Sequence, residues 1–268
     1  MNDAVRLLVS DVDGTLVDRA KRLTPATIAA VRQLAPAGIA FTIISARPRS
    51  GMIPIADALA IDAPMAAFNG GIVFRRDGTV IAHHRIAPDV ARGVFALADG
   101  LAVDRWLFAE DRWLASTDLG PHVAQERIAS AQAPVVTDDF AAFHDRADKI
   151  TFVSDDAAML RDLAARAIAV FGAEATIAQS QPYYLDITAR RANKGDGVAA
   201  LAELAGVPLS ATAAIGDQAN DLPMLARVGV SIAMGNAPDT VRAAASRVTG
   251  WNDAEGVAQA IREIVGTR

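Results

Sequence analysis

The chain has 268 residues, of which 52% are hydrophobic and 21% are charged, a composition that supports a sizeable core and excludes a disordered or collagen-like protein. The formal net charge of −5 argues against nonspecific nucleic-acid binding, which needs clustered Lys and Arg. The absence of Cys excludes disulfides, thiolate nucleophiles and zinc–sulfur sites, and it favours a reducing compartment.

The first predicted element is a short buried strand over residues 6–10. This apolar run is too short for a signal peptide and leads directly into Asp11 and Asp13. No stretch approaches the roughly 18 apolar residues that a membrane span needs. We therefore expect a cytoplasmic protein that makes no membrane contact.

The next part of the chain alternates helices with strands. Thr24 and Pro25 are typical of a helix start, and apolar residues at helical spacing continue until Gly38, which predicts the end of that helix. Asp77 and Gly78 predict a hairpin turn. The other elements expected here are strands at 39–44, 64–68, 72–74 and 80–82 and a helix at 49–59.

A different pattern occupies the middle of the chain and then gives way to the first one. Between 83 and 187 we expect helices at 90–98, 121–130 and 156–171 and strands at 102–109, 149–153, 174–178 and 183–187. After residue 193 we expect helices at 194–205, 222–228, 238–245 and 254–265 and strands at 211–215 and 230–233. The predicted fold is α/β: a doubly wound, Rossmann-like parallel-sheet core from residues 1–82 and 188–268, with an α+β domain of residues 83–187 inserted.

Two acidic residues, Asp11 and Asp13, follow the first strand in the run D-V-D-G-T-L. The carboxyl end of a strand is where open α/β sheets bind their ligands. Alternation along a strand would separate the two carboxylates, but Gly14 permits a turn that brings them together. A divalent cation would neutralise their repulsion. The alternative is a solvated turn that happens to contain two acidic residues.

A second acidic cluster, G-D-Q-A-N-D at 216–221, follows a later strand. Asp217 and Asp221 are four residues apart, so a helix start would place them on one face. A site of oxygen ligands without sulfur favours Mg²⁺ over zinc. The alternative role is to cap the helix predicted at 222, which is compatible with metal binding.

Two further residues suggest an anion site. Ser45 ends the second strand, where its hydroxyl and the following backbone N–H groups can hold phosphate oxygens. Lys194 begins a helix and supplies a point charge suited to phosphate. Each residue alone is uninformative, because a Ser such as Ser45 at the end of a strand is usually a cap and a lone Lys such as Lys194 usually lies on the surface.

The order of these four signals resembles the haloacid dehalogenase superfamily of phosphotransferases. The block at 83–187 lies between the second and third signals and is similar to the C2 cap of some members. Further segments resemble Cof-type (subfamily IIB) sugar-phosphate phosphatases: Asn69-Gly70-Gly71, residues 193–201, residues 234–245 and residues 252–258.

The resemblance implies a role for each matching residue. Asp11 would be the nucleophile that forms an aspartyl-phosphate, and Asp13 the general acid and base. Mg²⁺ would be held by Asp11, the Asp13 backbone carbonyl and Asp217, with Asp221 acting through the metal's waters. Ser45 and Lys194 would grip the phosphoryl oxygens, which suits a reaction governed by positioning and charge neutralisation. The remaining residues expected at the substrate are Thr15, Ala46, Arg47, Asn69 and Asn220.

The sequence departs from the family pattern in two places. Ala46 stands where Gly is usual, and Gln218 stands where a smaller residue is common. Because Gly tolerates positive φ and Ala does not, we expect a slightly different loop at Ala46. Arg47 has two expected roles: it could bind a second anionic group of the substrate, or it could pair with a carboxylate. Four cap aromatics could stack on a sugar or, more commonly, fill a core: Trp106, Trp113, Tyr183 and Tyr184.

The function predicted from these features is Mg²⁺-dependent hydrolysis of small phosphate monoesters, such as sugar phosphates. The expected partner is a small phosphorylated metabolite, and the expected assembly is a monomer or homodimer. A phosphomutase of the same fold remains an alternative, as does a nonenzymatic phospho-aspartate switch, although the latter needs neither Asp13 nor a cap. No G-x-G-x-x-G run follows the first strand, which argues against a dinucleotide enzyme.

Overall fold

The computed structural model describes residues 4–266 and divides into two compact units. The first unit is formed by Met1–Ala46, Met52–Ala82 and Asn193–Arg268, and the second by Arg47–Gly51 and His83–Ala192. These limits differ from the boundary expected after residue 187, because the last strand of the second unit runs to Ala189. The short segment 47–51 also joins the second unit.

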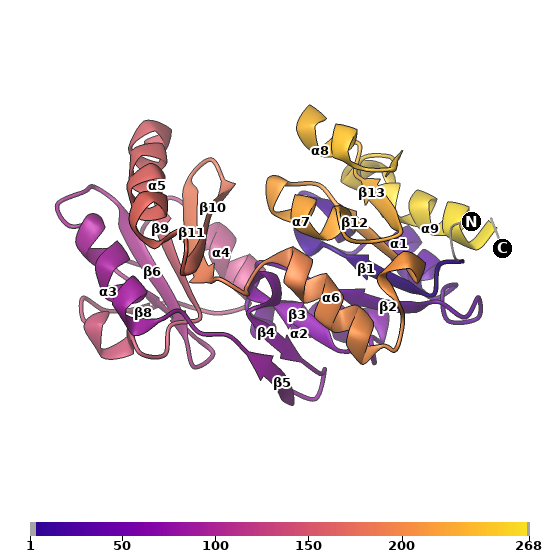
Figure 1. Ribbon diagram of the computed structural model, residues 1–268, viewed down its shortest axis with the longest axis horizontal. Coiled ribbons are helices and arrows are strands. Elements are labelled where there is room, and N and C mark those ends of the chain that lie inside the picture. Colours follow the sequence, from indigo (N-terminus) through magenta and orange to yellow (C-terminus); the bar gives the residue numbers. More distant parts are fainter. Residues whose placement is uncertain (1–3, 267–268) are drawn as a thin grey trace. The chain divides into compact units, whose positions relative to one another are not determined.

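A five-stranded parallel sheet forms the centre of the first unit, with the strand order β14-β13-β12-β1-β2 (Figure 1). The two central strands are almost fully buried, which explains their continuous apolar sequences. The strands are β1 (Leu7–Ser10), β2 (Ala40–Ile43), β12 (Thr212–Gly216), β13 (Val230–Ala233) and β14 (Arg247–Val248).

Helices cover the parallel sheet. The face that carries Leu7 and Val9 packs against α6 (Lys194–Leu204), α7 (Leu222–Leu225) and α8 (Asp239–Ala244) in one apolar cluster. Two further helices, α1 (Pro25–Val31) and α9 (Gly256–Gly266), contact each other. The unit is completed by α2 (Arg49–Leu59), which begins in segment 47–51, and by a small sheet of β3 (Met65–Ala67), β4 (Ile72–Phe74) and β5 (Val80–His83).

Helix α1 is shorter than its apolar spacing suggests. Thr24 caps it as expected, because its side-chain oxygen accepts the Thr27 N–H at 3.1 Å. The regular helix ends at Val31, and tighter bonds follow, from Gln33 N–H to the Ala30 carbonyl and from Leu34 N–H to the Val31 carbonyl. Pro36 disfavours helical geometry in the residue before it, so the chain tightens and turns before Gly38.

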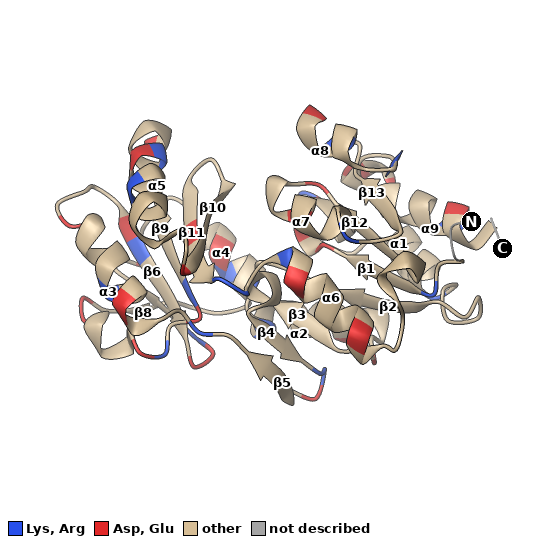
Figure 2. Ribbon diagram, in the orientation of Figure 1, with Lys and Arg blue, Asp and Glu red and all other residues tan. Residues whose placement is uncertain are grey.

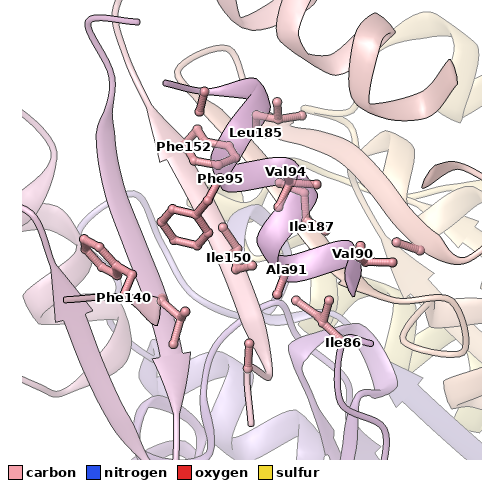
Figure 3. Close-up of a cluster of buried hydrophobic side chains, with 14 of the residues drawn as sticks. Ile86, Val90, Ala91, Val94, Phe95, Phe140, Ile150, Phe152, Leu185 and Ile187 are labelled. Atoms are coloured by element: carbon pink, nitrogen blue, oxygen red, sulfur yellow. The ribbon is translucent and has the colours of Figure 1, made fainter. Parts of the chain in front are cut away.

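The second unit is built on a six-stranded sheet with the order β10-β11-β9-β6-β7-β8, antiparallel except for the β7–β8 pair. Helices α3 (Pro88–Leu97) and α5 (Ala157–Phe171) pack on one face of it, where Phe95, Phe140 and Phe152 form the aromatic centre of the core (Figure 3). The strands are β6 (Asp104–Ala109), β7 (Arg112–Ala115), β8 (Val135–Val136), β9 (Lys149–Val153), β10 (Ala175–Gln181) and β11 (Tyr184–Ala189), and a further helix is α4 (Val123–Ser130).

The structure confirms the predicted fold class: a mainly parallel α/β core together with a separate antiparallel-sheet module. The pattern in the sequence missed the short strands β7, β8 and β14. Two of them have only two residues each, too few to show an alternation. Within residues 4–266, no helix has the length and apolar character required to cross a membrane.

Candidate active site

Asp11 lies at the carboxyl end of β1, where the backbone leaves the sheet. Its N–H still donates to the Ile215 carbonyl at 2.9 Å, so the neighbouring strand β12 fixes its position. Gly14 then turns the chain with φ of 77°. A Cβ at Gly14 would stand 2.3 Å from an Asp217 carboxylate oxygen, so glycine is needed both for the turn and for the close approach of the two loops.

Asp217 and Asp221 come from the loop that follows β12. The Asp221 carboxylate accepts the backbone N–H groups of Asp217 and Gln218, both at 2.8 Å. It makes no capping bond to α7 itself; its bond from the Gln218 N–H is instead part of a capping box on the short 3-10 helix of residues 219–221 that leads into α7. Asp221 instead folds the loop back on itself and thereby holds Asp217 against the end of β1.

Lys194 ties the two loops together from the first residue of α6. Its ammonium donates to Asp11 Oδ1 and to Asp221 Oδ1, the latter at 2.6 Å. The Lys194 side chain is only 1% exposed, and the side chains of Asp11 and Asp221 are 7% and 0% exposed. One buried ammonium group therefore forms ion pairs with two buried carboxylates.

The electrostatics of this cluster are dominated by burial and by crowding of like charge. Burial raises the pKa of Asp11 well above its usual value; Lys194 opposes this, and Asp221 and Asp217 reinforce it. Burial and then Asp221 raise the pKa of Asp217 to about 6. Desolvation would lower the pKa of Lys194, but the two carboxylates beside it raise it on balance, so the side chain stays charged.

This set of side chains fits a hard divalent cation. Carboxylate oxygens of Asp11, Asp217 and Asp221 lie within 4.8 Å of one another. Their donors are all oxygens, and only one ammonium, that of Lys194, is bonded within this group of three carboxylates. Oxygen ligands and uncompensated negative charge are what Mg²⁺ requires.

Asp13 and Thr15 lie on the turn that follows Asp11. Thr15 donates its hydroxyl to Asp217 Oδ1 at 3.0 Å, which steadies that carboxylate. The Asp13 side chain is not part of the three-carboxylate cluster; it accepts a hydrogen bond from Lys21 Nζ at 2.6 Å. It is 27% exposed, far more accessible than the carboxylate of Asp11.

Ser45, Asn69 and Asn220 form a second linked group in the same unit. The Asn69 N–H donates to the Ser45 carbonyl at 2.7 Å, and the Asn220 amide donates to Asn69 Oδ1 at 3.3 Å. Asn69 has a positive φ of 59°, which Asn tolerates better than most residues. Ala46, by contrast, is not among the described residues with positive φ, so this loop does not use the conformation that Gly would supply.

The remaining predicted residues belong to the second unit. Arg47 is buried there and donates to the Gly51 carbonyl at 3.2 Å. Trp106, Trp113 and Tyr184 are at most 7% exposed and pack edge-to-face, with Trp106 5.0 Å from Trp113 and 5.3 Å from Tyr184 between ring centroids. These three therefore fill a core, the commoner of the two roles considered from sequence.

Three residues at the site had no role assigned from sequence. Asn236 donates to the Gly14 carbonyl at 2.9 Å and to Asp217 Oδ2 at 3.4 Å. The Asn252 N–H donates to Asn236 Oδ1 at 3.0 Å, and the Asn252 amide donates to the Val17 carbonyl at 3.0 Å. The segments 234–245 and 252–258 carried the family resemblance, and these bonds explain why Asn stands at both positions. The third residue is Lys21, and its positive charge was the only sequence feature that could have indicated a role at the site.

The chain is similar in sequence and in structure to known hydrolases. The family model for haloacid dehalogenase-like hydrolases matches residues 8–261. A pyridoxal phosphate phosphatase of Escherichia coli is 25% identical, with 96% of this chain and 97% of that protein covered. An HMP-PP phosphatase of Escherichia fergusonii is 28% identical, with 89% and 87% covered. A haloacid dehalogenase-like hydrolase from Bacteroides thetaiotaomicron superposes with a TM-score of 0.85 at 26% identity, with 97% and 99% covered.

Proposed function

Because the chain belongs to the haloacid dehalogenase-like hydrolase family, we propose that it hydrolyses small phosphate monoesters with the help of Mg²⁺. The observation that carries this proposal is the cluster of Asp11, Asp217 and Asp221 around Lys194 at the carboxyl ends of β1 and β12. Such a cluster combines a carboxylate nucleophile, a cation for phosphoryl oxygens and ligands for a metal.

Asp11 is the nucleophile in this proposal. One of its carboxylate oxygens attacks phosphorus, the bond from phosphorus to the ester oxygen breaks, and its electron pair leaves with that oxygen. Asp13 gives the leaving oxygen a proton and afterwards takes one from the water that attacks the aspartyl-phosphate. Lys194 holds Asp11 in place and offers its charge to the transferring group, with the Ser45 hydroxyl as a second contact.

Mg²⁺ bound by Asp11, the Asp13 carbonyl and Asp217 would supply the charge that neutralises the phosphoryl oxygens. Asp221 holds Asp217 through its backbone N–H and so keeps the ligand set together. Thr15 and Asn236 each bond the Asp217 carboxylate, which limits the positions its oxygens adopt. Asn69 and Asn220 remain candidates for substrate contact.

The substrate is proposed as the phosphate ester of a small organic alcohol. Relatives of comparable identity are named for pyridoxal phosphate and for HMP-PP, so identity at this level does not select one compound. Sugar phosphates and pyridoxal phosphate are the first compounds to test. We further propose that residues 83–187 form the cap that determines this choice, with Arg47 as a partner for a second charged group of the substrate.

Hydrolysis of 4-nitrophenyl phosphate with and without metal tests the proposal. We expect turnover with Mg²⁺, loss of turnover after chelation with EDTA, and recovery when Mg²⁺ is added back. Ca²⁺ should support less turnover because its coordination is looser. Full activity after exhaustive chelation would contradict the metal assignment. Absence of hydrolysis across aryl, sugar and pyridoxal phosphates would contradict the proposed reaction.

A further inference from the structure

The side chain of Lys21 is held by a closed turn that follows the Asp11 loop. The Asp18 N–H donates to the Arg22 carbonyl at 3.0 Å, and the Lys21 N–H donates to the Asp18 carbonyl at 2.9 Å. The Asp18 carboxylate accepts both the backbone N–H and the guanidinium of Arg22 at 2.9 Å. The hydrogen bond from the Arg22 N–H lowers the pKa of Asp18, so the Asp18 carboxylate stays ionised at neutral pH.

Lys21 has a backbone conformation that this turn must enforce. Its φ is 62°, in the left-handed region that a residue with a long side chain rarely occupies. Such a conformation costs free energy and persists only where the surrounding bonds impose it. The consequence of the conformation is the direction of the side chain: the Lys21 ammonium meets Asp13 Oδ1 at 2.6 Å.

The pair between Lys21 and Asp13 differs from the other ion pairs of this turn. Its side chains are 20% and 27% exposed, whereas the side chains of Arg19 and Arg22 are 73% and 76% exposed. Arg19 pairs with Asp253 and Arg22 with Asp18, so neither of these cations is directed at Asp13. A half-buried pair is less screened by solvent than the exposed ones, and it orients its partner more firmly.

A firmly oriented Asp13 matters because proton transfer depends on geometry. A general acid must lie within hydrogen-bond reach of the oxygen that leaves, and small displacements cost large factors in rate. A cation bonded to one carboxyl oxygen restricts rotation of the whole carboxyl group. Lys194 stands in the same relation to Asp11, so each of the two aspartates of the D-V-D run has its own lysine.

We propose that Lys21 is a positioning residue that holds the Asp13 carboxyl in the orientation required to protonate the leaving oxygen. This inference rests on the proposed function, in which Asp13 is the general acid. Lys21 itself loses no proton in the step: the proton passes from Asp13 to the leaving oxygen as the bond to phosphorus breaks, and Lys21 stays bonded to the resulting carboxylate.

The basicity of the leaving group separates this role from a structural one. The alkoxide of benzyl phosphate is strongly basic and needs a proton as it leaves, whereas 4-nitrophenolate leaves without help. The value of kcat/KM reports the steps up to this departure. Loss of a well-positioned acid therefore lowers kcat/KM for benzyl phosphate and spares kcat/KM for 4-nitrophenyl phosphate.

The experiment compares Lys21→Met with Lys21→Arg on both substrates in the Mg²⁺-loaded protein. For Lys21→Met we expect kcat/KM for benzyl phosphate to fall by about 10²-fold, the lower end of the contribution of a general acid, and kcat/KM for 4-nitrophenyl phosphate to fall by less than about threefold. Lys21→Arg should recover most of the loss. Arg19→Met removes an exposed cation from the same turn and should change neither value.

Thermal unfolding of each variant is measured beside the kinetics, and Lys21→Met should shift the midpoint by no more than about 4 °C. An equal loss on both substrates, or no loss on either, would overturn the positioning role while leaving the proposed function intact. A wild-type protein that hydrolyses neither ester would overturn both. Failure of Lys21→Arg to recover kcat/KM for benzyl phosphate would also contradict the inference.

Discussion

Each unit of the molecule contains a buried lysine that is paired with aspartate, and the two pairs differ in their balance of charge. In the first unit, Lys194 bonds two of three clustered carboxylates. In the second unit, Lys149 lies 3.2 Å from one carboxylate oxygen of Asp186, and that oxygen also accepts the Thr151 hydroxyl at 2.7 Å. One cation among three anions leaves excess negative charge, whereas one cation beside one anion does not.

The two pairs also differ in where the sequence places them. Figure 2 shows strands β1 and β12 without charged residues; the charged residues of the cluster follow these strands or, in the case of Lys194, begin α6. Lys149 and Asp186 instead lie within strands β9 and β11. Charges at strand ends meet backbone N–H groups and incoming ligands, while charges within a sheet face meet neighbouring side chains. Under the proposed function, the first cluster binds a ligand, whereas the second pairs charges inside its own sheet.

The largest effect is expected for Asp11→Asn. An amide is a far poorer nucleophile, so turnover of 4-nitrophenyl phosphate should fall by about 10⁴-fold or more. The metal-free protein should keep its fold, because burial already disfavours the charged form of Asp11. Steady-state kinetics and circular dichroism measure the two properties. Asp239→Asn, which changes an exposed carboxylate in α8, is the control, and a variant at Asp11 with a tenth of wild-type turnover would refute the covalent mechanism.

The two buried lysines offer a matched pair of substitutions. Lys194→Met should lower kcat/KM for 4-nitrophenyl phosphate by about 10²- to 10³-fold, because a charge at the transferring group is lost. Lys149→Met should change it by less than about threefold. Each variant leaves buried carboxylate without its cation, so each should lose about 3 kcal/mol of unfolding free energy in urea. Equal losses of kcat/KM in the two variants would contradict the proposed difference between Lys194, which acts at the transferring group, and Lys149, which does not.

The cluster in the first unit should make the stability of the metal-free protein depend on pH. The pKa of Asp217 is about 6 in the folded chain against about 3.9 when unfolded, so its contribution is fully present below pH 4 and is lost as the pH rises through 6. The metal-free protein should therefore lose of the order of 2–3 kcal/mol from this group between pH 4 and pH 7. Urea unfolding across this range measures the loss.

Asp217→Asn supplies the control for that pH series. The slope of stability against pH should become less steep in this variant, since one of the two carboxyl groups with a raised pKa in the cluster is gone. Added Mg²⁺ should stabilise the wild-type protein more at pH 7 than at pH 5, because protons compete with the metal for the same oxygens. A wild-type protein whose pH slope is unchanged by Asp217→Asn would show that other groups carry the titration.

The smallest expected effect is in the second unit, at Trp113. Its indole N–H and that of Trp106 have no hydrogen-bond partner in the described chain, and neither does Asp186 Oδ2. Trp113→Phe removes a buried donor that nothing accepts, which offsets part of the packing that the smaller ring loses. The unfolding free energy should change by no more than about 1 kcal/mol. A loss above about 3 kcal/mol would show that the indole N–H is satisfied in solution.

The sequence predicted the first unit better than the second, for a physical reason. Asp11, Asp217 and Asp221 follow apolar strands, and parallel strands bring their carboxyl ends to one edge, so local patterns indicate a shared site. The contacts of Lys21 and Asn236 depend on a left-handed backbone and on a loop more than 200 residues away in sequence, which no local pattern encodes. In the second unit, the strand β8 has only two residues and is too short to show an alternation, whereas β9, which contains the buried Lys149, lies where the sequence predicted a strand.

The mass of Asp13→Asn after exposure to 4-nitrophenyl phosphate and Mg²⁺ tests most directly whether Asp11 is the nucleophile. Without its general base, the protein should retain one phosphoryl group, and peptide mapping should locate that group on Asp11. The adduct should be absent when EDTA is present and absent in the double variant Asp11→Asn, Asp13→Asn. A phosphoryl group on any other residue, or an adduct that persists in the double variant, would contradict the assignment of Asp11 as the nucleophile.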